Sequence, residues 1–170
     1  VINAVINRYG SPSIINVEVA SEVNRSYEER MKIDKLQRDN EKANEKIKSE
    51  IIELGYDEDS VTQTMIDKYK LYQQQGGKCL YSGKSIDLKA CLGGSSSYEI
   101  DHIIPYSLIL DNTLNNKALV LSKENQAKCQ RTPLQYMRKE QAAEFQSRIN
   151  ELYKKHSINE RKYEYLMLPN

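Results

Sequence analysis

The chain has 170 residues, of which 39% are hydrophobic and 29% charged, and its formal net charge is +1 at pH 7. This length predicts one domain of ordinary size, or a smaller domain with helical extensions, and it is enough to bury a core. A mean hydropathy of −0.72 excludes a membrane-spanning segment. The balanced charge excludes the strongly basic composition of many nucleic-acid-binding proteins. We therefore expect a soluble protein.

Charge is nevertheless unevenly distributed along the chain. Residues 1–116 carry a net charge of −4, whereas residues 117–162 carry +6. The cysteines are Cys79, Cys91 and Cys129; they form no CxxC pair, and we expect no signal peptide. Three cysteines without such a pair argue against a disulfide framework or a zinc ribbon. We expect packed, reduced thiols in a cytoplasmic protein. The first residue is Val1 rather than Met, and we interpret the chain as a piece of a larger protein.

The first half of the chain predicts a short strand and two helices. Residues 13–20 (SIINVEVA) alternate and are rich in Ile and Val, which predicts a strand with Glu18 near its end. Residues 21–54 lack Pro and Gly and show a thin apolar stripe among balanced charges, which indicates a long polar helix of the kind that connects domains. A second amphipathic helix is expected over residues 60–75, ended by a pair of glycines.

The second half predicts a compact mixed fold. Residues 98–102 and 117–121 are expected to be partner strands. A short helix should follow over residues 122–129, and a longer helix should begin at Thr132, where Gln135 completes a capping box.

The most informative stretch is IDHIIPYS at residues 100–107, followed by NNK at 115–117 and KEN at 123–125. Asp101 and His102 are consecutive on the predicted strand, so their side chains should face opposite sides unless the strand twists or bulges there. A carboxylate and the amide oxygen of Asn125 are hard oxygen donors of the kind Mg²⁺ prefers. A neutral imidazole can take a proton from water near pH 7.

This order of strand, loop, strand and helix resembles the ββα-metal fold of HNH nucleases, and specifically the HNH domain of the type II CRISPR effectors, the RNA-guided DNA endonucleases. The resemblance rests on CLYSGK at 79–84, DHIIPYS at 101–107, NNK at 115–117, ENQ at 124–126 and TP at 132–133. It implies an α+β fold with a ββα-metal core and flanking helices. The compact CLYSGK form is similar to that of the smaller effectors.

The resemblance also implies a role for each matched residue. His102 would be the general base for the attacking water, and Asp101 and Asn125 would bind Mg²⁺, for which Mn²⁺ would substitute. Asn116 would brace the loop and orient the histidine, and Lys128 would meet a phosphate. The expected reaction is hydrolysis of a DNA phosphodiester with one metal ion.

The segment IINVEVA at 14–20 resembles a strand of the RuvC nuclease domain of the same effectors, which would make Glu18 a metal ligand of a second site. The implied organisation is a RuvC-like strand at 1–20, a linker helix at 21–55, an HNH core at 56–135, and a C-terminal helix with the outgoing linker at 136–170.

The implied partners are the target DNA strand in an RNA–DNA heteroduplex, guide RNA held by the parent protein, and the RuvC domain of the same parent chain. A low net charge agrees with such a domain, because base pairing rather than the protein reads the sequence. The implied location is the bacterial cytoplasm, with no membrane partner, and the isolated piece is expected to be a monomer.

Other interpretations remain open at this stage. The Asp–His pair can be structural, the two asparagines can be turn residues, Lys128 can be a solvated side chain, and Glu18 can be an edge-strand carboxylate. The chain can also be a non-catalytic module that uses its basic third to hold nucleic acid or another domain, or a stand-alone HNH nuclease of the homing or toxin kind.

Overall fold

The computed structural model describes residues 6, 8, 10 and 27–169. The predicted strand at 13–20, with Glu18, lies outside the described residues. The chain forms two compact units, residues 1–39 and 40–170. In the described part, no helix is both long enough and apolar enough to cross a membrane.

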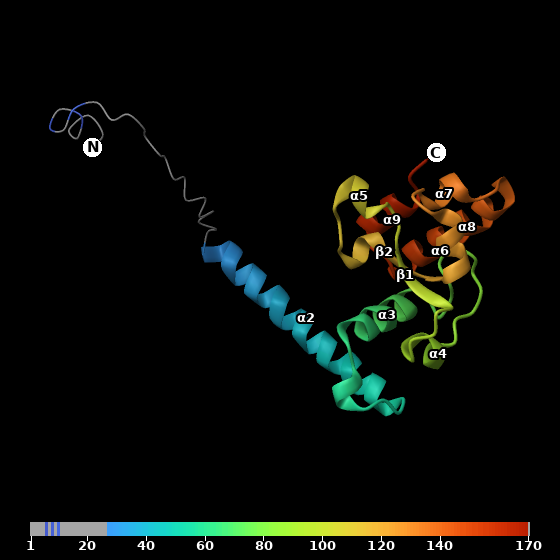
Figure 1. The fold of residues 1–170 in the computed structure, drawn as a ribbon, viewed down its shortest axis with the longest axis horizontal. Helices are drawn as coiled ribbons and strands as arrows, with labels where there is room; N and C mark the ends of the chain where they lie inside the picture. The colour runs from blue at the N-terminus through green and yellow to red at the C-terminus, as the bar shows by residue number, and fades with distance from the viewer. Residues whose placement is uncertain (1–5, 7, 9, 11–26, 170) are drawn as a thin grey trace. The chain divides into compact units, whose positions relative to one another are not determined.

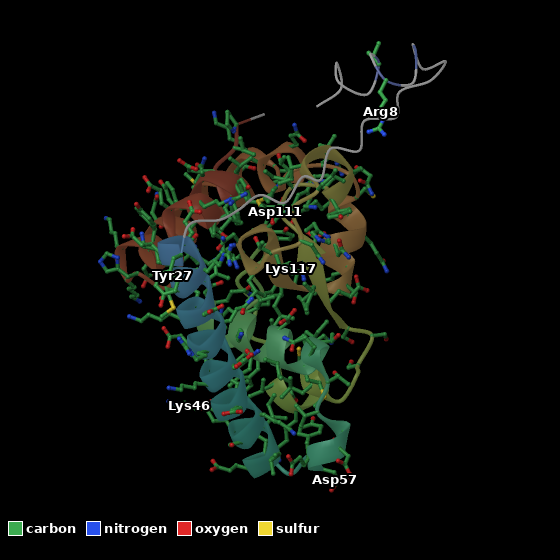
Figure 2. All side chains as sticks on the ribbon, turned by 90° about the vertical axis from the view of Figure 1, so that its left-hand side faces the viewer. Arg8, Tyr27, Lys46, Asp57, Asp111 and Lys117 are labelled. Atoms are coloured by element: carbon green, nitrogen blue, oxygen red, sulfur yellow. The ribbon has the colours of Figure 1, made fainter. Side chains whose placement is uncertain are left out.

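A long helix, α2, runs from Tyr27 to Glu53, as the polar sequence predicted (Figure 1). Tyr27 at its start is 77% exposed, and the side chain of Lys46 further along is also exposed (Figure 2). Only the second half of its thin apolar stripe is buried, at Ile47 and Ile51. These two side chains pack with others from the second unit in a small apolar cluster, completed by Ile66 and Leu92. Gly55 follows the helix with φ +100°, a conformation that favours glycine.

Two short elements and a helix lead from α2 toward the sheet. A single 3₁₀ turn, η1 (Glu58–Ser60), precedes α3 (Gln63–Gln74), which begins where the Thr62 side chain accepts a hydrogen bond from the backbone N–H of Met65. The expected second helix is therefore confirmed. Gly76 and Gly77 both have positive φ and turn the chain into a segment that ends with α4 (Leu88–Leu92).

The sheet consists of two antiparallel strands, β1 (Tyr98–His102) and β2 (Lys117–Leu121), which confirms both predicted strands. Their register pairs Tyr98 with Leu121 at one end and His102 with Lys117 at the other. The connection between them contains α5 (Tyr106–Ile109) and the 3₁₀ turn η2 (Leu114–Asn116). Helix α6 (Ser122–Lys128) follows β2 directly, and it packs back on both strands.

The C-terminal part departs from the single long helix that the sequence predicted. It forms three helices: α7 (Pro133–Tyr136), α8 (Lys139–Lys154) and α9 (Glu160–Leu166). Met137 is extended, with φ −75° and ψ 143°, and ends α7. Helix α8 then begins with its own cap, because the Gln141 side chain accepts the backbone N–H of Arg138. At Thr132 the corresponding contact from Gln135 is present, as predicted.

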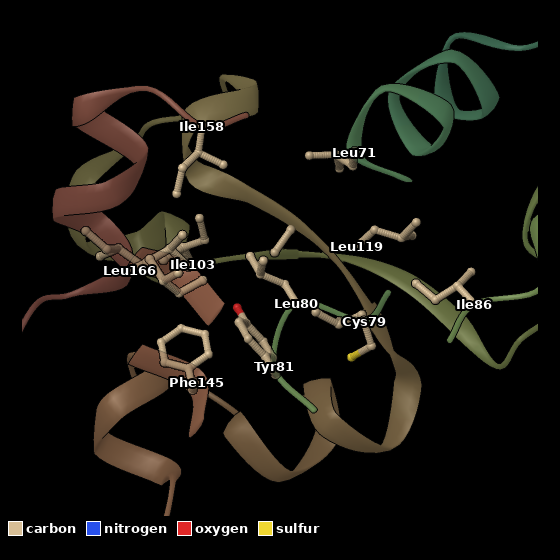
Figure 3. Close-up of a cluster of buried hydrophobic side chains, with 14 of the residues drawn as sticks. Leu71, Cys79, Leu80, Tyr81, Ile86, Ile103, Leu119, Phe145, Ile158 and Leu166 are labelled. Carbon is tan, nitrogen blue, oxygen red and sulfur yellow. The ribbon is translucent and has the colours of Figure 1, made fainter. Parts of the chain in front are cut away.

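The main hydrophobic core lies between the sheet and the C-terminal helices (Figure 3). Ala118, Leu119 and Val120 of β2 are fully buried, which explains the unbroken apolar run in that strand. Phe145 of α8 packs edge-on against Tyr81, with ring centroids 6.2 Å apart. The core therefore fixes the backbone from which the polar residues of the candidate site project.

Among the described residues, the buried Lys162 side chain has no carboxylate partner. Lys162 of α9 is 1% exposed, and its ammonium group donates to Gln74 Oε1 at 2.6 Å and to the Leu114 carbonyl at 3.2 Å. Burial lowers the pKa of Lys162 to about 7. At neutral pH the folded state therefore holds this proton less tightly than the unfolded state does.

This difference predicts a pH-dependent stability. Above pH 7 the unfolded chain binds one proton more at this site than the folded chain, so the free energy of unfolding should rise by up to about 1.4 kcal/mol per pH unit relative to Lys162→Met. Urea unfolding of both proteins between pH 7 and pH 9 measures the difference. Parallel pH dependences of the two proteins would show that the Lys162 ammonium is not destabilised by burial.

Candidate active site

A pocket of about 290 Å³ opens where β1 ends and α6 faces it. Four of the five described residues that the sequence singled out line it: Asp101, His102, Asn125 and Lys128. The consecutive Asp101 and His102 line the same pocket, although a regular strand would place them on opposite sides. His102 is the last residue of β1, and the chain then turns toward α5, whose first residues complete the wall of the pocket.

Two side chains, Tyr81 and Lys128, contact the Asp101 carboxylate. The Tyr81 hydroxyl donates to Oδ2 at 2.6 Å, and the Lys128 ammonium lies 3.0 Å from the same oxygen. Burial, and then the charge of Asp101, raise the pKa of Tyr81 well above its usual value, so the phenol stays protonated and donates. The role of Tyr81 was not predicted; its only sequence signal was its place in the CLYSGK run.

Lys128 lies deeper than the sequence suggested. Its side chain is 1% exposed, and besides Asp101 it contacts the His102 carbonyl at 2.9 Å. The ammonium group thus joins α6 to the last two residues of β1.

Asn125 reaches the pocket from the middle of α6. Its amide nitrogen donates to Glu99 Oε2 at 2.6 Å, which fixes the amide so that Oδ1 is the atom left to act as a ligand. Glu99 was not predicted to take part. It precedes Asp101 by two residues on β1 and therefore shares its face of the strand.

His102 contacts a residue of the loop that follows α5. Its Nε2 lies 3.1 Å from Asn112 Oδ1, and its ring lies 5.5 Å from the ring of Tyr106, measured between centroids. Neither contact was predicted, because no local pattern links these positions. Together they hold the imidazole on two sides.

Asn116 lies outside the pocket and is completely buried. Its side chain accepts from the Ile104 N–H and donates to the carbonyls of Ile104 and Asp111, each at 2.9 Å. These contacts tie the two ends of the loop between the strands to each other.

The donor chemistry of the pocket fits a divalent cation. Tyr81 donates to Asp101 Oδ2, and Lys128 lies closer to Oδ2 (3.0 Å) than to Oδ1 (3.4 Å), so Oδ1 is the oxygen that a cation would take. With Asn125 Oδ1 it offers two hard oxygen donors, and Mg²⁺ commonly takes one or two from protein and fills the rest with water and phosphate. No group of three or more His, Cys, Asp or Glu side chains that could hold a metal occurs among residues 27–169. This excludes a closed metal cage there but not such an open site.

Comparison with known proteins agrees with this geometry. Residues 79–134 match the sequence model of a family described as HNH endonuclease. These residues span the Cys79–Lys84 turn, both strands, α6 and the start of α7. The chain therefore carries an endonuclease domain of the HNH family.

The relatives of this HNH domain are type II CRISPR effectors, as the sequence motifs predicted. The chain is 37% identical over 142 residues to CRISPR-associated endonuclease Cas9 1 of Streptococcus thermophilus, covering 79% of this chain and 13% of that protein. It is 46% identical over 94 residues to the Cas9 of Staphylococcus aureus, covering 55% of this chain and 8% of that protein. The chain thus spans a small part of the length of these relatives.

Solved structures show the same relationship. The crystal structure of Streptococcus thermophilus Cas9 in complex with the GGAA PAM superposes with a TM-score of 0.72 at 29% identity, covering 99% of this chain and 17% of that one. The type II-C Cas9 of Actinomyces naeslundii has a TM-score of 0.60 at 20% identity, covering 99% of this chain and 20% of that one, which shows a shared fold.

The buried contacts of Asn116 predict a large effect on stability. Replacing it by Ala leaves one N–H and two carbonyls without their partner, so Asn116→Ala should lower the free energy of unfolding by about 3 kcal/mol. Urea unfolding measures this loss. Asn115→Ala is the matched control: Asn115 makes an exposed contact with Asn159, and its removal should cost less than about 1 kcal/mol. Equal losses in the two variants would show that the buried hydrogen bonds do not hold the loop.

Proposed function

We propose that this chain is the metal-dependent HNH nuclease domain of an RNA-guided CRISPR effector, and that it cleaves the target DNA strand paired to the guide RNA. The observation that carries the proposal is the convergence of Asp101, His102 and Asn125 on one pocket, at the junction of two strands and a helix. That arrangement supports a ββα-metal core. The family match and the Cas9 relatives support the enzyme class.

Asp101 and Asn125 would hold Mg²⁺ through one oxygen each, and Mn²⁺ should substitute for it. When bound, the cation supplies charge stabilisation to the scissile phosphate and to the leaving oxygen. The protein prepares this site in advance: Tyr81 and Lys128 hold the Asp101 carboxylate in place, and Glu99 fixes the amide of Asn125. Preorganised groups need no reorientation when charge develops during the reaction.

His102 is the group that takes the proton from the attacking water. It borders the same pocket as the two oxygen ligands, and an imidazole exchanges protons readily near pH 7. The water oxygen forms a bond to phosphorus as the bond to the 3′ oxygen breaks, and the 3′ oxygen takes up a proton from solvent. The products are a 5′ phosphate and a 3′ hydroxyl.

Lys128 and Asn116 would have supporting roles in the reaction. Lys128 lines the pocket, so a phosphate bound there would meet its positive charge even though the side chain is buried against Asp101. Asn116 braces the loop after β1 and thereby supports His102. Glu18, outside the described residues, would be a ligand of a RuvC-type site completed by other parts of the parent protein.

The parent protein would supply the remaining partners. These are guide RNA, the heteroduplex that the guide forms with the target strand, and the RuvC domain. Such a division agrees with the nearly neutral net charge of the chain, because base pairing would supply the sequence recognition. The bacterial sources of the relatives favour a bacterial effector.

The test uses the full-length effector that contains this chain, programmed with a guide and supplied with DNA labelled on each strand separately. His102→Ala should reduce target-strand cleavage by at least about a hundredfold, since a general base contributes a factor of this order. Cleavage of the other strand, and binding of the guide-matched DNA, should be retained. Removal of divalent cations should abolish target-strand cleavage, and Mg²⁺ or Mn²⁺ should restore it.

The chain provides a matched control in its second histidine. His156 lies in an exposed turn after α8, far along the chain from the pocket residues. His156→Ala should leave both strands cleaved as in the unmodified effector. Undiminished target-strand cleavage in His102→Ala would overturn the proposed function. Binding that depends on salt but not on Asp101, without cleavage under any divalent cation, would favour a non-catalytic module instead.

A further inference from the structure

The contact between His102 and Asn112 restricts which nitrogen of the imidazole can act. Asn112 Oδ1 lies 3.1 Å from His102 Nε2, and an amide oxygen can only accept a hydrogen bond. With a neutral ring this contact is a hydrogen bond only in the tautomer that carries its proton on Nε2, and in that tautomer Nδ1 is the acceptor. Asn112 is itself exposed, so something else has to hold it in place.

That support comes from the neighbouring residue, Asp111. Its side chain is only 8% exposed, and one carboxylate oxygen accepts from Arg161 at 3.1 Å and from the Tyr165 hydroxyl at 3.2 Å (Asp111 is labelled in Figure 2). The other oxygen accepts the backbone N–H of Thr113 at 2.8 Å. The Thr113 contact is the main reason why the pKa of Asp111 is lowered, and the carboxylate therefore stays ionised toward Arg161.

Arg161 and Tyr165 are themselves held as a pair on α9. The Arg161 Nε donates to the Tyr165 hydroxyl at 2.9 Å, and the guanidinium carbon lies 5.5 Å from the centre of the Tyr165 ring. They are four residues apart, so they lie on one face of the helix. Two further contacts join α9 and its cap to the same loop: Lys162 donates to the Leu114 carbonyl, and Asn159 donates to Asn115 Oδ1.

We infer that α9 positions the catalytic histidine, with Arg161 and Tyr165 fixing Asp111 and thereby placing Asn112 against His102 Nε2. The inference rests on the proposed function for its catalytic meaning, but the positioning itself is a property of the described residues. Asn112, Arg161 and Tyr165 are positioning residues, since they reach the reaction only through His102. Helix α9, about sixty residues after His102 in the chain, would thus determine which ring nitrogen of His102 acts as the proton acceptor.

The direct test is heteronuclear NMR on the isotope-labelled 170-residue chain, which contains only two histidines. Under mildly alkaline conditions, where an imidazole carries one proton, His102 should show an Nε2–H signal that exchanges slowly with water. Asn112→Leu removes the acceptor, and exchange of this proton should become at least about tenfold faster. Asn112→Asp keeps an acceptor oxygen and should restore slow exchange. His156 serves as the internal reference.

Variants of α9 test the longer connection. Arg161→Gln combined with Tyr165→Phe should also accelerate exchange of the His102 Nε2–H, because Asp111 loses both contacts to the helix. Glu164→Gln is the matched control: it also changes the charge of α9 by one unit, but at an exposed position. The backbone amide spectrum of each variant verifies that the fold is retained.

A second readout uses the full-length effector. Asn112→Leu should slow single-turnover cleavage of the target strand about tenfold, with unchanged DNA binding, and Asn112→Asp should recover most of the rate. The inference would be overturned if the His102 Nε2–H exchanged equally fast in the unmodified chain, in Asn112→Leu and in the α9 double variant, or if Glu164→Gln matched the double variant. Failure of the proposed function would be recognised separately, because His102→Ala would then cleave normally while the NMR result could still stand.

Discussion

The side chain of Asn116 is the contact on which the geometry of the site depends. Antiparallel strands are often joined by tight turns, but here residues 103–116 lie between β1 and β2. Such a loop has many conformations available to it, and fixing them costs conformational entropy. Asn116 stands at the end of the loop and contacts the backbone of Ile104 near its start and of Asp111 within it. It is fully buried, so water cannot replace these hydrogen bonds. The position of α5, and with it the wall of the pocket, follows from this closure.

A second constraint is the buried ion pair between Lys128 and Asp101, two residues that line the pocket. Lys128 and Asp101 are oppositely charged and almost completely removed from water, which strengthens their attraction but costs desolvation. Such pairs add little net stability, but removing one partner is costly because it leaves a buried charge without compensation. Here the pair joins α6 to β1, and Tyr81 adds a neutral donor to the same carboxylate. The pair thereby holds the Asp101 carboxylate at the edge of the pocket.

The sequence predicted those parts of the fold that depend on local patterns. Both strands, α3 and the start of α7 were predicted from alternation, apolar spacing and caps, and motif spacing brought Asp101, His102 and Asn125 together. The break between α7 and α8 was not predicted. It falls at Met137 and Arg138, and neither is a proline or glycine, the residues that usually mark the end of a helix in a sequence. Tyr81, Glu99, Asn112 and α9 were missed for another reason: their contacts join residues distant along the chain. Lys128 was identified as a site residue, but its burial depends on the packing of α6, which composition does not reveal.

We propose that Asp101 and Asn125 form a divalent-cation site beside His102. A crystal structure of the 170-residue chain soaked in Mn²⁺, with anomalous scattering used to locate the ion, tests this site. We expect a peak between Asp101 Oδ1 and Asn125 Oδ1, at coordination distance from both and on the side of the pocket that His102 borders. The absence of a peak there at saturating Mn²⁺, or a peak that engages neither oxygen, would contradict it.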